Sequence, residues 1–174
     1  MPRPLYSEPG DRIESTRPVT VSRYRGFIRA NHWITALSLI LLLVSGLAFF
    51  HPSLYFLTGL FGGGQTARWL HPIIGVVLFV SFMVMFIQLW RLNLPTPDDR
   101  KWLNQIGDVV KGNEENLPEL GKYNAGQKFI FWGMTLLIVV LIVSGIMIWE
   151  QFFGELVSIP TRRWAVLTHA LAAV

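Results

Sequence analysis

The chain has 174 residues, of which 52% are hydrophobic and only 15% are charged, whereas average soluble domains carry about 25% charged residues. It contains no cysteine, which excludes disulfide scaffolds, thiolate-bound iron–sulfur clusters, cysteine zinc sites and haem attached through a CxxCH motif. The net charge of +4 comes from basic residues that flank long charge-free stretches, so it indicates membrane topology rather than nucleic-acid binding.

Residues 1–31 are polar and rich in arginine, and we interpret them as a cytoplasmic N-terminal tail that is partly extended. The apolar run that follows is too long for the hydrophobic region of a signal peptide. Residues 32–174 are therefore predicted to form one transmembrane domain.

Three runs of 18, 22 and 21 residues carry no charge, which matches the roughly 20 apolar residues that a helix needs to cross a bilayer. A helix is required because backbone groups in hydrocarbon must pair within the segment. A fourth apolar run starts at Trp164 and stops at Val174, so the fourth helix is predicted to be cut short at the chain end. The predicted fold is all-α, an integral membrane four-helix bundle with helices at about 33–50, 69–90, 129–149 and 164–174 onward.

The basic residues predict an orientation. Residues 1–31 hold six arginines and residues 91–128 hold six lysines and arginines, whereas the two loops on the other side hold three basic residues. The positive-inside rule then places the N-terminus in the cytoplasm. In the inner loop, apolar residues at helical spacing predict a short amphipathic helix on the membrane surface, under a partner subunit or against its own bundle: Trp102, Leu103, Ile106, Val109 and Val110.

Two histidines are predicted to lie at similar depth near the outer side. His71 follows Trp69 by two residues and His169 follows Trp164 by five, whereas His32 lies on the opposite side. A neutral imidazole is a common axial ligand of haem iron, and histidines on different helices can hold one haem between them. The alternative is that each histidine only forms an interhelical hydrogen bond. His51, beside Pro52, is interpreted as an interfacial residue.

Glycines support the haem interpretation. Gly46 and Gly145 each follow a Val-Ser pair near the outer end of a predicted helix, and Gly75 lies one turn after His71. A porphyrin needs a close approach of the backbone, which glycine permits, although ordinary packing of small residues explains the pattern as well. A second haem at His32 would need a ligand about 14 residues after His169, in a helix that continues past Val174.

Several segments together resemble one family. They are Asn31-His32-Trp33, RWLHP at residues 68–72, KGNE at 111–114, GKYNAGQK at 121–128 and LTHA at 167–170. From Arg23 to Val174 the chain resembles the cytochrome b (gamma) subunit of membrane-bound respiratory formate dehydrogenase. The resemblance implies four transmembrane helices and two b haems, of which one is fully liganded by the residues present. It makes His71 and His169 the ligands of the outer haem and His32 one ligand of the inner haem.

The resemblance also implies partners and a bacterial inner-membrane location. Formate would be oxidised at a molybdenum or tungsten pterin centre on the alpha subunit, and electrons would pass through the iron–sulfur (beta) subunit and the haems to a membrane quinone. This chain would be an electron-transfer subunit and not an enzyme on its own. Asn124 and Gln127 would contact the quinone, since their amides can bond a carbonyl. They can also start a helix, with Asn124 as N-cap and Gln127 reaching back to it. Lys128 is interpreted as an interfacial anchor.

Two alternatives stay open. One is a related di-haem cytochrome b that serves a hydrogenase or thiosulfate reductase, with the same fold and haems but another electron donor. The other is a cofactor-free membrane anchor whose histidines only form hydrogen bonds.

Overall fold

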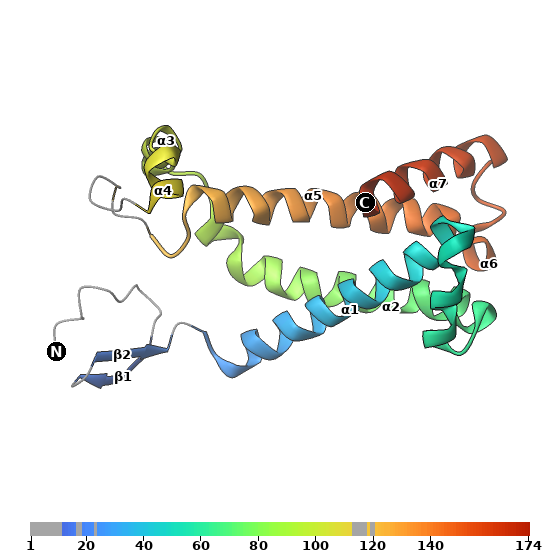
Figure 1. Cartoon of the computed structure of the whole chain (residues 1–174), viewed down its shortest axis with the longest axis horizontal. Coiled ribbons are helices and arrows are strands. Elements are labelled where there is room, and N and C mark those ends of the chain that lie inside the picture. The colour runs from blue at the N-terminus through green and yellow to red at the C-terminus, as the bar shows by residue number, and fades with distance from the viewer. Residues whose placement is uncertain (1–11, 17–18, 23, 113–117, 119–120) are drawn as a thin grey trace. The chain divides into compact units, whose positions relative to one another are not determined.

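The computed structural model describes residues 12–16, 19–22, 24–112, 118 and 121–174 (Figure 1). The chain divides into two compact units, unit 1 with residues 1–30 and 87–132 and unit 2 with residues 31–86 and 133–174. Three long helices contribute residues to both units: α1 (Gly26–Phe50), α2 (Gly64–Leu89) and α5 (Ala125–Ile148). Asn113 and Glu114 of the KGNE motif, and part of the N-terminal tail (1–11, 17, 18 and 23), lie outside the described residues.

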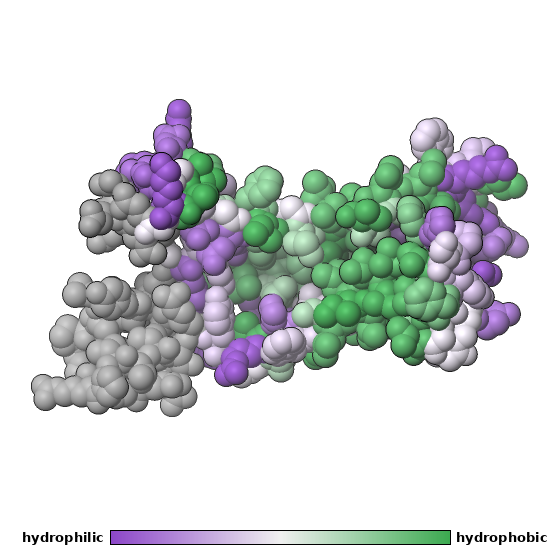
Figure 2. Space-filling view, viewed as in Figure 1, coloured by the Kyte–Doolittle hydropathy of each residue, from purple (hydrophilic) through white to green (hydrophobic). Residues whose placement is uncertain are grey.

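Helices α1, α2 and α5 are each long and apolar enough to cross a membrane, as predicted. Only 22%, 17% and 11% of their most apolar stretches are buried within the chain. Figure 2 shows hydrophobic side chains over the visible face of unit 2, with hydrophilic ones gathered where α1 ends and α7 starts. Water-soluble chains rarely expose so large an apolar surface, so these helices are suited to lipid.

The helices begin earlier than the charge-free runs. α1 begins at Gly26 rather than near 33, α2 at Gly64 rather than 69, and α5 at Ala125 rather than 129. A charge-free run marks the part of a helix suited to hydrocarbon, whereas the helix itself extends into the polar interface, where long basic side chains are tolerated. The predicted boundary at residue 31 therefore falls inside α1.

The fourth apolar run forms α7 (Ile159–Ala173), after a short helix α6 (Glu150–Phe153). α7 begins at its N-cap Ser158, whose hydroxyl oxygen accepts a hydrogen bond from the Thr161 amide at 3.4 Å, and Pro160 occupies the first turn. The described chain is thus predominantly helical, as predicted. That four helices form one bundle stays a prediction.

A 3₁₀ helix that was not predicted, η1 (Pro52–Phe61), connects α1 to α2. His51 is its N-cap: Nδ1 accepts a hydrogen bond from the Ser53 amide at 3.2 Å. η1 ends at Gly62, whose φ of 82° favours glycine. Gly64, at the start of α2, leaves space that the phenol of Tyr55 fills.

Buried polar contacts join α1 to α2 within unit 2. The side-chain amide of Asn31 donates to the Ser81 carbonyl at 2.8 Å, and the Thr35 hydroxyl donates to the Ser81 hydroxyl at 3.0 Å. Further along, Ser45 contacts His71. Rising numbers on α1 meet falling numbers on α2, so the two helices run antiparallel, joined by the polar contacts that are favoured between helices in lipid.

Unit 1 contains a β-hairpin and short helices. Strands β1 (Arg12–Thr16) and β2 (Val19–Ser22) pair antiparallel with a bulge between Ile13 and Ser15. After η2 (Trp90–Asn93), the predicted amphipathic helix is divided at Gln105 into α3 (Pro97–Asn104) and α4 (Ile106–Lys111). Gln105 has φ −106° and ψ 18°, outside the helical range, and Gly107 beside it is a weak helix former. Trp102 is buried, whereas Val110 is 82% exposed.

Candidate functional site

His71 and His169 face one another in unit 2. Their ring centroids lie 6.2 Å apart with an angle of 64° between the ring planes. His71 is the eighth residue of α2 and His169 the eleventh of α7. Phe49, on α1, approaches the His71 ring edge-on with centroids 6.1 Å apart. The structure therefore brings together the two histidines for which the sequence predicts a similar depth.

The separation of the rings fits a metal ion held between them. A ring nitrogen binds a metal at about 2 Å and the ring centre lies about 1 Å further, so two imidazoles on opposite sides of one ion have centroids about 6 Å apart. The described residues contain no group of three or more histidine, aspartate or glutamate side chains suited to a metal ion. Two protein donors suit a haem iron, because the porphyrin supplies the other four.

Each of these histidines has a serine partner on the preceding long helix, which the sequence analysis did not identify. The Ser45 hydroxyl oxygen lies 2.7 Å from Nδ1 of His71, and that of Ser144 lies 2.9 Å from Nδ1 of His169. Both serines are buried. The signal in the sequence is the repeated Val-Ser-Gly, of which only the glycines were assigned a role.

The predicted glycines border the rings to different degrees. A Cβ atom at Gly145 would lie 3.3 Å from Cε1 of His169, and one at Gly46 would lie 3.7 Å from Cε1 of His71. Apart from the backbone of its own helix and its chain neighbours, no heavy atom of the described residues comes within 4 Å of a Cβ built at Gly75. Gly46 and Gly145 thus let the helix backbones approach the imidazoles closely, whereas Gly75 does not contact them.

The other two histidines lie elsewhere. His32 is exposed near the start of α1, and its ring packs edge-on against the neighbouring Trp33 with centroids 6.0 Å apart. Within the described part of the chain, His32 contacts no other histidine. His51 is the N-cap of η1, and its interpretation as an interfacial residue stays a prediction.

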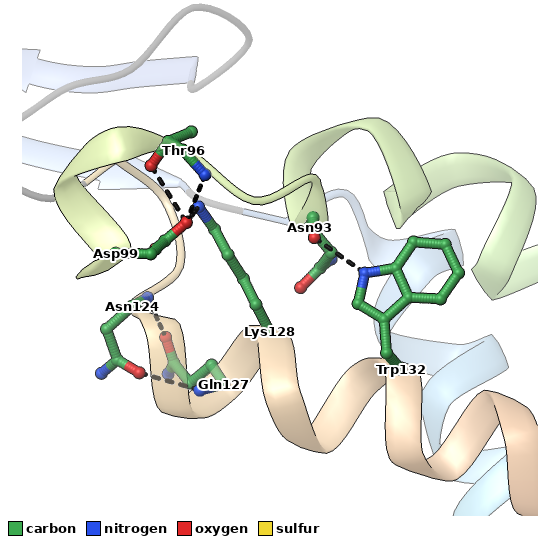
Figure 3. A network of polar contacts seen from close by, with 7 residues as sticks. All are labelled: Asn93, Thr96, Asp99, Asn124, Gln127, Lys128 and Trp132. Carbon is green, nitrogen blue, oxygen red and sulfur yellow. Dashed lines mark hydrogen bonds and ion pairs between the residues drawn. The ribbon is translucent and has the colours of Figure 1, made fainter. Parts of the chain in front are cut away.

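A second cluster of polar residues lies at the start of α5 in unit 1 (Figure 3). The backbone N–H of Gln127 donates to Oδ1 of Asn124 at 2.8 Å, and the backbone N–H of Asn124 donates to Oε1 of Gln127 at 3.0 Å. This reciprocal pair confirms the predicted helix start. The side-chain NH₂ groups of both residues have no partner within the described residues.

Lys128, interpreted from the sequence as an interfacial anchor, does not extend its ammonium group into solvent. It is buried, and its Nζ lies 2.8 Å from Oδ2 of Asp99 on α3 (Figure 3). Oδ2 also accepts from the amide and hydroxyl of Thr96 at 2.6 and 3.0 Å, whereas Oδ1 is buried without a partner among the described residues. The interpretation was wrong because the partner is 29 residues away, where a spacing argument on α5 gives no signal.

These contacts stabilise the ionised form of Asp99. Burial alone raises the pKa of its carboxyl group, but the hydrogen bonds from Lys128 and Thr96 outweigh burial, so the pKa lies below the usual value. A cavity of about 290 Å³ adjoins the pair, and its lining mixes charged and polar side chains, among them Arg91, Lys122 and Tyr123, with the apolar Leu92 and Leu94. Unit 1 therefore presents a cavity of mixed polarity beside the start of α5.

Comparison with known proteins identifies the family. Residues 23–174 match the prokaryotic cytochrome b561 family. The formate dehydrogenase cytochrome b556(fdo) subunit of Escherichia coli (strain K12) is 46% identical over 89% of this chain and 72% of its own length. The nitrate-inducible cytochrome b556(Fdn) subunit of the same strain is 41% identical over 84% of this chain and 67% of its own length. The formate dehydrogenase cytochrome b556 subunit of Haemophilus influenzae is 36% identical over 93% of this chain and 68% of its own length.

These matches confirm the resemblance predicted from the motifs. They span the facing histidines, their glycines and the start of α5 in one continuous alignment range. The chain belongs to the prokaryotic cytochrome b561 family and groups with the cytochrome b556 subunits of formate dehydrogenases.

Proposed function

We propose that this chain is the membrane cytochrome b subunit of a formate dehydrogenase complex and passes electrons from formate oxidation to a membrane quinone. The observation that carries this is the pair His71 and His169, whose 6.2 Å separation suits one iron in a chain of a cytochrome b family. Family membership implies haem b as the cofactor. The chain transfers electrons and leaves formate oxidation to another subunit, which the names of its relatives support.

His71 and His169 are the axial ligands of one b haem, with Gly46 and Gly145 beside the rings and Gly75 one turn beyond His71. The contacts of Gly46 and Gly145 with the imidazoles support this assignment. His32 is a ligand of a second b haem. Its support is the Asn31-His32-Trp33 motif together with a side chain that is exposed and engaged only by the ring of Trp33 among the described residues.

Asn124 and Gln127 contact the quinone. Their oxygens are used in the reciprocal cap, but each keeps an NH₂ group able to donate to a quinone carbonyl. Their neighbours in the chain, Lys122, Tyr123 and Lys128, line a cavity of about 290 Å³ that could hold a quinone ring. The chemistry of the NH₂ groups supports a ligand with a carbonyl, and the resemblance of the GKYNAGQK segment is the reason for choosing a quinone as that ligand.

An iron–sulfur subunit and a molybdenum or tungsten pterin subunit are the partners. The relatives are subunits of formate dehydrogenases, which supports membership of a complex. The chain lies in the bacterial inner membrane with its N-terminus in the cytoplasm, because twelve of its fifteen basic residues fall in segments 1–31 and 91–128.

The haem assignment is tested by measuring b haem per copy of the subunit in the purified complex with a pyridine haemochrome assay. His71→Ala and His169→Ala each remove the same haem, and His32→Ala removes the other. His51→Ala is the matched control, because His51 caps η1 and leaves haem content unchanged. A complex with no haem, or one that keeps all its haem in His71→Ala, contradicts the assignment.

The quinone assignment is tested with substitutions that keep the helix cap. Asn124→Asp and Gln127→Glu retain the capping oxygens but remove the NH₂ donors. Quinone reduction by formate is expected to fall in both variants, while reduction of the haems by formate is unchanged. Wild-type quinone reduction in both variants would exclude these amides as quinone contacts.

A further inference from the structure

The two imidazoles of unit 2, His71 and His169, each make the same kind of contact with a serine of another helix. Ser45 on α1 contacts Nδ1 of His71 on α2, and Ser144 on α5 contacts Nδ1 of His169 on α7. A glycine follows each serine and faces Cε1 of the same ring. Serine and histidine are separated by 26 residues in one case and 25 in the other. Nothing in the family match assigns a role to either serine.

The hydroxyl protons decide which ring nitrogen carries hydrogen. Each serine oxygen lies close to the carbonyl four residues earlier in its helix, at 2.8 Å from Leu41 for Ser45 and 2.6 Å from Val140 for Ser144. Two oxygens at such distances need a proton between them, and a hydroxyl has only one. The serine proton therefore goes to the helix carbonyl, and the oxygen presents a lone pair to Nδ1.

It follows that Nδ1 carries the hydrogen in both rings. A neutral imidazole protonated at Nδ1 has its free lone pair at Nε2. The same arrangement at both histidines leaves Nε2 of each ring with a lone pair that can bind a metal. Metal-binding histidines commonly donate their second N–H to an oxygen acceptor, which fixes the tautomer and raises the basicity of the ligating nitrogen.

We infer that Ser45 and Ser144 are positioning residues that hold His71 and His169 as equivalent Nε2 ligands and lower the reduction potential of the haem between them. The inference rests on the proposed haem ligation by these histidines. An N–H that donates to a serine oxygen places more electron density on Nε2, which stabilises ferric iron over ferrous iron. Because the two half-sites are alike, each serine acts in the same direction.

The experiment uses the purified complex with Ser45→Ala, Ser144→Ala and the double variant. Ser38→Ala is the matched control, since Ser38 is a buried serine on the same helix as Ser45 with no hydrogen bond to a histidine. The readouts are haem content, the optical and EPR spectra of the oxidised protein, and the midpoint potential from redox titration. Where Ser→Ala does not retain haem, Ser→Cys keeps the volume with a poorer acceptor.

Each single variant is expected to keep its haem, bind it about tenfold more weakly and show a higher midpoint potential. The double variant shifts further in the same direction, and Ser38→Ala matches the wild type. If His71→Ala removes the haem but the serine variants keep wild-type potentials and spectra, the inference is overturned and the proposed function stays intact. Absence of haem from the wild-type complex would overturn both.

Discussion

The buried pair of Lys128 and Asp99 gives the sharpest prediction about stability. Lys128→Met keeps the length of the side chain and removes the charge, so Asp99 stays buried with an uncompensated carboxylate. At 2.8 Å and an effective dielectric constant of about 20, the attraction between the two charges is about 6 kcal/mol. Burial of both groups offsets part of this. Removing one partner of a buried pair is therefore expected to cost about 3–5 kcal/mol of unfolding free energy.

The assay is thermal unfolding of the purified complex in detergent, followed by intrinsic fluorescence. For a chain of this size, about 3–5 kcal/mol corresponds to a melting temperature lower by roughly 6–20 °C. The double variant Lys128→Met with Asp99→Asn is the control. It removes both charges and keeps an oxygen that accepts from Thr96, so it is expected to recover most of the lost stability.

The pH dependence supplies an independent check. In the wild type the pKa of Asp99 is lowered, so the pair stabilises the fold above about pH 4 and loses its effect as pH falls through the folded-state value. In Lys128→Met the lysine no longer offsets the effect of burial on the pKa of Asp99. The difference in unfolding free energy between variant and wild type therefore grows as pH rises through about 4. An equal deficit at pH 4 and pH 7, or a double variant as unstable as Lys128→Met, refutes the reasoning.

Three further substitutions follow from the same contacts. Gly145→Ala places a methyl group 3.3 Å from His169 and is expected to alter the haem spectrum, since that neighbour must shift; an unchanged spectrum contradicts the close approach. The methyl group of Gly75→Ala meets no atom of the described residues beyond its own helix backbone and chain neighbours, so the apoprotein should unfold as the wild type does; haem loss from this folded variant would show that the porphyrin passes beside Gly75. His51→Ala removes the cap of η1 and is expected to cost about 1 kcal/mol in thermal unfolding without changing haem content; haem loss would contradict its capping role.

The long helices were predictable because the bilayer imposes a length and an absence of charge that a sequence displays directly. Their true starts were not, because polar residues at the interface neither require nor forbid a helix. η1 was missed for a related reason. Its residues carry no charge, and although Gly62 provides a C-cap, the N-cap is His51, a residue rarely used in that position.

The histidine pair was predictable from depth alone, since one coordinate along the membrane normal is readable from the neighbouring tryptophans. The serines and the Lys128–Asp99 pair were not, because they depend on which faces of separate helices meet. A serine in a helix usually bonds its own backbone, and nothing in Val-Ser-Gly distinguishes that case from one in which the same oxygen also contacts an imidazole.

Two opposing effects set the potential expected for a haem between His71 and His169. The charged residues of unit 2 are Arg68, Glu150, Glu155, Arg162 and Arg163, whereas the side chains described in contact with the two imidazoles are the neutral Ser45, Ser144 and Phe49. A site of low polarity disfavours the more highly charged ferric state and raises the potential, whereas the serine contacts lower it.

Phe49→Gln tests the balance between these effects, because Phe49 packs beside His71 and the substitution adds polarity without touching Ser45. The midpoint potential is expected to fall in Phe49→Gln and to rise in Ser45→Ala, at equal haem content in redox titrations. A rise of the potential in both variants would contradict the effect of polarity, and a fall in both would contradict the effect of the serine.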